Sequence, residues 1–170
     1  MLESPKEVFV MLLSEARQNA EKAAELHKEL VQMAEDHPQI KELIEARAFL
    51  AVKGLETLDH CFKLIGARPV VVKARLHHEV FMEELRKHLA EIKSPVGRHL
   101  FLLAKLGHLN HIRIGEIEAL LTADVTRHEG VHALLEGTKA ARVAFAERTR
   151  RLARRIVEAK VIEHQLEGAA

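Results

Sequence analysis

The apolar side chains of this chain recur three and four residues apart, which predicts helices along nearly its whole length. A first helix is expected to begin at about residue 5, because Ser4, Pro5 and Glu7 combine an N-cap, a proline at the first helical position and a capping-box glutamate. The helix should continue to about residue 35. Its predicted core face consists of Phe9, Leu12, Leu13, Ala16, Ala20, Ala23, His27, Leu30 and Ala34.

Breaks in the pattern divide the rest of the chain into four more predicted helices. The break at 36–38 is short, so the second helix should fold back against the first and end at Gly66, a residue suited to a helix C-terminus. Pro95 marks another helix start, and Thr126 with Glu129 forms a capping box. The four helices are expected at about 38–66, 71–92, 95–121 and 126–165.

The last of these helices is unusually long for a bundle of this size. About 40 residues at 1.5 Å per residue extend for about 60 Å, so the helix must overhang the bundle or kink. With 170 residues, of which 48% are hydrophobic, the chain is expected to form one domain over residues 1–170 with one core. The predicted fold class is all-α.

Composition and charge exclude several classes of function. The 26 Lys and Arg residues are balanced by 25 Asp and Glu residues, so no overall field attracts nucleic acid or an anionic membrane. The arginine-rich segment 148–155 is interpreted as a solvated helix face, and nucleic-acid binding is not expected. Cys61 is the only cysteine, which excludes an intramolecular disulfide and a thiolate-rich metal site. No signal segment or membrane span is predicted, and the expected location is the cytoplasm.

One short motif suggests catalysis. His128, Glu129 and His132 match H-E-x-x-H, in which helical spacing presents two imidazoles to one zinc ion while the glutamate activates its water. The chain contains 12 histidines, and Glu129 already has a capping role, so a chance match is the favoured interpretation. A zinc hydrolase at this motif is therefore the alternative prediction.

Three segments resemble the YciE/YciF-type ferritin-like stress proteins. They are residues 8–16 (VFVMLLSEA), 58–66 (LDHCFKLIG) and 105–110 (KLGHLN), which are similar to parts of that family's first, second and fourth helices. The order and lengths of the helices agree over nearly the whole chain. The resemblance implies a ferritin-like four-helix bundle of two antiparallel hairpins, with an extra connecting helix.

The resemblance also implies where a di-metal site would lie, since ferritin-like bundles hold two metals through Glu and Glu-x-x-His groups from four helices. On the fifth helix the expected carboxylates fall near Ala140 and Ala141. Nearly all the positions of this chain that correspond to the family's metal ligands hold apolar, small or cationic residues, which do not bind iron or manganese. Together with His27, which lies on a predicted core face, the positions of interest as former ligands or pocket lining are Ala20, His27, Leu50, Lys53, Gly107 and Asn110.

The leading prediction is therefore a non-catalytic, metal-free bundle that acts as an oligomeric structural or binding protein, with a small ligand as one candidate for its core. The fourth helix has a second apolar side at Leu102, Leu106 and Leu109, which is either central to the bundle or buried in a homodimer or larger homo-oligomer. No cofactor is expected. The alternative is an enzyme with iron, manganese or zinc, bound either at His128 and His132 or by a set that comprises Glu21, His27, His108 and His111.

Overall fold

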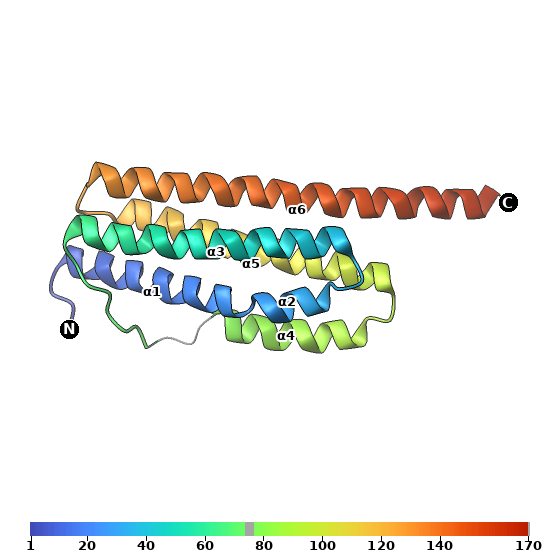
Figure 1. The fold of residues 1–170 in the computed structure, drawn as a ribbon, viewed down its shortest axis with the longest axis horizontal. Helices are drawn as coiled ribbons and strands as arrows, with labels where there is room; N and C mark the ends of the chain where they lie inside the picture. Colours follow the sequence, from blue (N-terminus) through green and yellow to red (C-terminus); the bar gives the residue numbers. More distant parts are fainter. Residues whose placement is uncertain (74–76, 170) are drawn as a thin grey trace.

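The computed structural model describes residues 1–73 and 77–169, and this part of the chain is an all-α bundle without strands. Two helices, α1 and α2, follow one another along α3 and form the first hairpin, while α5 and α6 form the second (Figure 1). The connecting helix α4 packs on α5 and α1. The predicted two-hairpin bundle is thus confirmed. The helices are α1 (Pro5–Glu25), α2 (His27–Met33), α3 (Pro38–Ile65), α4 (His77–Glu91), α5 (Pro95–Ala123) and α6 (Glu129–Ala169).

Local capping fixes several helix ends where the sequence predicts them. The Ser4 hydroxyl accepts a hydrogen bond from the Glu7 amide at 3.2 Å, and the Glu7 carboxylate accepts one from the Ser4 amide at 2.9 Å. The Ser94 hydroxyl accepts from the amide of Gly97 at 3.1 Å. Gly66 ends α3 with φ 64°, a left-handed conformation that costs glycine little. The capping chemistry is local, which is why the sequence could predict it.

The predicted helix over residues 5–35 is wrong in one respect, since it is interrupted at Leu26. Near the break, the Ala23 carbonyl in the last turn of α1 accepts a hydrogen bond at 3.5 Å from the guanidinium of Arg47, a buried residue of α3. A side chain that inserts into a helix's hydrogen-bond ladder is a common cause of such a break.

The predicted third helix also begins later than expected. The amide of Val70 donates to the Ser14 hydroxyl at 3.0 Å, and the amide of Val72 donates to the Gln18 side chain at 3.3 Å. These bonds hold the connection against α1, residues 71–73 are not helical, and α4 is described over His77–Glu91. The part of the predicted helix over residues 74–76 lies outside the described residues.

The start of α6 differs from the predicted capping box. The Asp124 carboxylate accepts from the Thr126 amide at 3.0 Å, which closes a turn before the helix. The imidazole Nδ1 of His128 then accepts from the Gly130 amide at 3.1 Å, and α6 begins at Glu129. His128 therefore has the capping position that the sequence assigned to Thr126.

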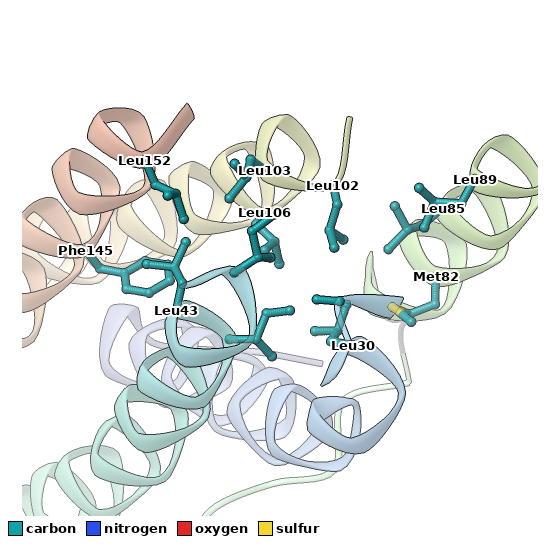
Figure 2. Packing of buried hydrophobic residues seen from close by; sticks show 13 residues of the cluster. Leu30, Leu43, Met82, Leu85, Leu89, Leu102, Leu103, Leu106, Phe145 and Leu152 are labelled. Carbon is teal, nitrogen blue, oxygen red and sulfur yellow. The ribbon is translucent and has the colours of Figure 1, made fainter. Parts of the chain in front are cut away.

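The buried apolar residues form two clusters, one toward each end of the bundle. The first combines α2 and α4 with the neighbouring parts of α3, α5 and α6, and includes Leu30, Met82, Leu106 and Leu152 (Figure 2). The second lies around Phe9, Leu13, Leu58, Phe62 and Leu135. Because α5 contributes Leu102, Leu106 and Leu109 to the interior, its second apolar side is central to the bundle.

The C-terminal part of α6 extends beyond the other helices (Figure 1). Every described residue from Val157 onward is exposed, so this part of the helix overhangs the bundle. Its apolar residues Val161, Ile162 and Leu166 are between 50% and 67% exposed. No helix of the described residues is long and apolar enough to cross a membrane.

Candidate functional site

A layer of buried polar side chains separates the two apolar clusters. It contains three arginines from three helices, Arg47 on α3, Arg113 on α5 and Arg142 on α6, each at most 6% exposed. Asn19 and Asn110 are buried in the same layer, each at most 2% exposed. Buried arginines are rare unless they are paired, so this layer is the candidate functional site.

Glu116 is the main carboxylate that faces these arginines. Its Oε1 accepts from Nη1 of Arg113 at 2.9 Å, and its Oε2 accepts from Nδ2 of Asn19 at 2.8 Å. Nη2 of Arg113 lies 3.4 Å from Nδ1 of His78. The Arg113 Nε is buried without a hydrogen-bond partner among the described residues. Glu116 therefore neutralises Arg113 but leaves part of its guanidinium unused.

Arg142 has no such partner. Its carbonyl accepts a hydrogen bond from Nδ2 of Asn110 at 2.9 Å, but its guanidinium makes no hydrogen bond or ion pair within the described residues. Burial, reinforced by the charge of Arg113 and opposed by that of Glu116, lowers the pKa of Arg142 to about 10. Burial, together with Arg142 and Arg113, lowers the pKa of Arg47 to about 9. The layer therefore holds more positive charge than its carboxylates balance.

Two spaces adjoin this layer. A central cavity of about 30 Å³, which has room for one or two waters, is lined by residues that include Ala20, Arg113 and Glu116. A wider groove of about 280 Å³ lies between α3 and α6. Gly54, Thr138 and Arg142 line both spaces. Arg142 thus lies where the groove meets the central cavity.

Of the six residues predicted to mark the site, three line the two spaces and a fourth bonds to the backbone of Arg142. Ala20 lines the cavity, Leu50 and Lys53 line the groove, and Asn110 bonds to the Arg142 carbonyl. Lys53 is at the exposed edge, where its ammonium pairs with Glu56 at 3.0 Å. The remaining two, His27 and Gly107, line neither space.

The residues of the layer do not fit a di-metal centre. Within the described residues, no group of three or more His, Cys, Asp or Glu side chains could hold a metal ion. Glu21 pairs with Arg17 at 2.7 Å on the outer side of the bundle, and both His108 and His111 are exposed. The alternative set that includes Glu21, His27, His108 and His111 is therefore not assembled.

The H-E-x-x-H motif does not form a zinc site in the described residues. His128 uses Nδ1 to cap α6, and the His132 side chain is 61% exposed with Nε2 3.8 Å from a carboxylate oxygen of Glu136. Glu129 and His132 line a shallow space of about 470 Å³ together with Asp124 and Arg127. Among the residues that the structure describes, no third ligand completes this pair of histidines.

Sequence reasoning missed the three arginines, although one signal marks them. Arg47 continues the buried series of Ile44, Ala51 and Gly54 at three-four spacing, so a helical projection places it on the core face. Arg113 and Arg142 likewise stand between buried residues of their helices. A single charged residue on an otherwise apolar helix face is therefore the signal by which the sequence could have indicated a buried arginine.

Comparison with known proteins agrees with this fold. A family described as domain of unknown function (DUF892) matches residues 4–162. The chain belongs to this family. The crystal structure of the Escherichia coli stress protein YciF matches with a TM-score of 0.80 at 17% sequence identity, covering 92% of this chain and 99% of that one. No curated protein matches the chain. The resemblance to YciE/YciF-type proteins and the all-α bundle are thereby confirmed.

Proposed function

We propose that this member of the family is a non-catalytic, metal-free ferritin-like bundle that acts as a binding protein. The observation that supports the proposal is the layer of Arg47, Arg113 and Arg142 at the bundle centre. A divalent cation about 5 Å from one guanidinium would be repelled by about 7 kcal/mol at an effective dielectric constant of about 20. Glu116, already bonded to Arg113 and Asn19, cannot offset three such repulsions.

Metal analysis of protein purified without a histidine tag tests this proposal. We expect iron, manganese and zinc each at well below one equivalent per chain, and no rise in melting temperature when the divalent metals are added. Stoichiometric iron or manganese would overturn the metal-free proposal. Stoichiometric zinc that disappears in His128→Ala but persists in the His111→Ala control would favour the zinc hydrolase instead.

The proposal includes self-association as a homodimer or larger homo-oligomer. Because the second apolar side of α5 is buried within the chain, we assign the contact to the exposed apolar residues on the overhanging part of α6, Val161, Ile162 and Leu166. Sedimentation of the full chain should show an oligomer at micromolar concentration. Ile162→Glu should shift it toward the monomer, whereas Glu163→Gln, a neighbouring exposed substitution, should not. A monomeric full chain would refute this part.

A cytoplasmic location and a role under stress complete the proposal. The first rests on the single cysteine, which excludes an intramolecular disulfide and suits a reducing compartment, and the second on similarity to a protein described as a stress protein. Fractionation of cells that express the full chain, and growth of a deletion strain under osmotic and oxidative stress, would test each. Recovery of the chain outside the cytoplasm, or unchanged growth under every stress, would contradict the respective part.

A further inference from the structure

The guanidinium of Arg142 is buried and has no ion-pair partner of its own among the described residues, because the oxygens of Glu116, the carboxylate that acts on it, are bonded to Arg113 and Asn19. Its side chain lines both the central cavity and the groove, the residue is 6% exposed, and no described carboxylate pairs with it. A buried charge is costly unless it is paired and hydrogen-bonded. The adjacent groove is the path by which an external anion can reach it.

The walls of the groove determine which anions fit. Leu50, Leu134 and Ala141 provide apolar surface, and Thr57 and Lys53 add polar groups. At about 280 Å³ the groove lies just below the range of about 300–1,000 Å³ found for most small-molecule pockets, so its ligand is small. An apolar wall ending at a guanidinium suits a molecule with an aliphatic tail and one planar anionic group.

Electrostatics favour a single negative charge on this molecule. Glu116 lines the central cavity together with Arg142 and would repel a second anionic group placed in that cavity. A guanidinium matches a carboxylate with two parallel hydrogen bonds. We infer that the groove between α3 and α6 binds a small aliphatic monocarboxylate whose carboxyl group is held by Arg142.

Two glycines keep this groove open. A Cβ added to Gly54 or to Gly137 would meet no atom within 4 Å, so neither glycine is required by close packing of the helices. Glycine inside a helix lowers stability by up to about 1 kcal/mol relative to alanine. Both residues line the groove, and their lack of side chains gives the aliphatic tail its space.

This inference rests on the proposed binding role and is tested separately from it. The probe is sodium hexanoate, titrated into ¹⁵N-labelled full-length protein at constant ionic strength, with sodium phosphate and 1-hexanol as comparison ligands. Hexanoate should shift the amide resonances of residues around Gly54, Gly137 and Thr138, and the shifts should saturate below about 10 mM. Metal content is measured on the same sample, so failure of the metal-free proposal is visible independently.

Two variants and one control decide the role of the site. Arg142→Gln should weaken hexanoate binding at least tenfold, and Gly137→Leu should weaken it similarly by filling the groove while leaving Arg142 in place. Arg148→Gln, which changes an exposed arginine on the same helix, should bind like the parent. Circular dichroism checks that each variant folds. The inference is overturned by absent hexanoate shifts, by equal binding of 1-hexanol, by saturable binding of phosphate alone, or by unchanged affinity in Gly137→Leu.

Discussion

Replacement of Arg47 by methionine should stabilise the fold, although it removes a buried side chain's hydrogen bond. Burial, followed by the charges of Arg142 and Arg113, lowers the pKa of Arg47 from its ordinary value to about 9. At about 1.4 kcal/mol per pKa unit, this corresponds to roughly 5 kcal/mol against the charged form in the folded state. The residue is only 2% exposed, so solvent screens little of this cost.

The favourable contacts of Arg47 recover only part of that cost. Its guanidinium donates to the Ala23 carbonyl at 3.5 Å, near the C-terminal end of α1, where positive charge is favourable. A long hydrogen bond and the helix dipole together contribute about 2 kcal/mol. Methionine fills a similar volume without a charge. The net gain expected for Arg47→Met is therefore about 3 kcal/mol, or a rise in melting temperature of about 6–12 °C for a chain of this size.

Urea denaturation and thermal melts in a buffer of low anion concentration measure the effect. Arg148→Met is the matched control, because Arg148 is half-exposed and pairs with Glu42 on the surface, and it should change stability by about 0.5 kcal/mol at most. An unchanged or lower melting temperature for Arg47→Met would refute the reasoning, since it would mean that the charge of Arg47 is compensated in the folded protein. A change in the urea m-value would instead indicate an altered unfolded state.

Three further predictions concern the cap, the core and the thiol. Backbone amides of Glu3 and Ser4 lower the pKa of Glu7 below 4.5, so its stabilising contribution is present above pH 4.5 and is lost as the pH falls through the folded pKa. An NMR titration should find this lowered pKa, and the loss should be absent in Glu7→Gln. Leu106→Ala should destabilise the fold by about 2–5 kcal/mol in urea, because Leu106 is fully buried, and a loss below 1 kcal/mol would contradict the assigned packing. Burial, with Asp124, raises the pKa of the Cys61 thiol to about 11, so a thiol reagent at pH 8 should modify it only after unfolding. Rapid modification of the native protein would show that the second cluster opens.

The parts of the fold that depend on local chemistry could be predicted from the sequence. The Ser4 capping box and the Gly66 helix end involve residues three or four apart, so the pattern contains all the partners. The break at Leu26 could not be predicted, because the Arg47 side chain that bonds beside it comes from another helix. The non-helical connection before α4 likewise depends on Ser14 and Gln18, more than 50 residues away.

Some of the positions singled out in the sequence lie beside the arginine layer, but the arginines themselves were not predicted. Ala20 and Asn110 were identified because the resemblance placed them at the bundle centre, and both lie there. The arginines were missed because a charged residue on an apolar stripe is ordinarily found at its solvated edge, with its head in water. Only the packing of four helices determines that Arg142 instead reaches inward. The sign of the charge at the centre is therefore a property of the tertiary structure.

The arginine layer also determines how the helices align along the bundle axis. The faces on either side of it are rich in leucine, and such faces tolerate displacement by one helical turn of about 5.4 Å. That displacement would place a guanidinium among the leucines of Figure 2. Burying the charge there would cost far more free energy than burying it in the arginine layer. We expect a variant with methionine at positions 47, 113 and 142 to be more stable than the parent, yet to give several sets of amide resonances, one for each alignment. A single set of resonances would mean that leucine packing alone fixes the alignment of the helices. The charges that weaken this fold would then be the reason that it has a single alignment.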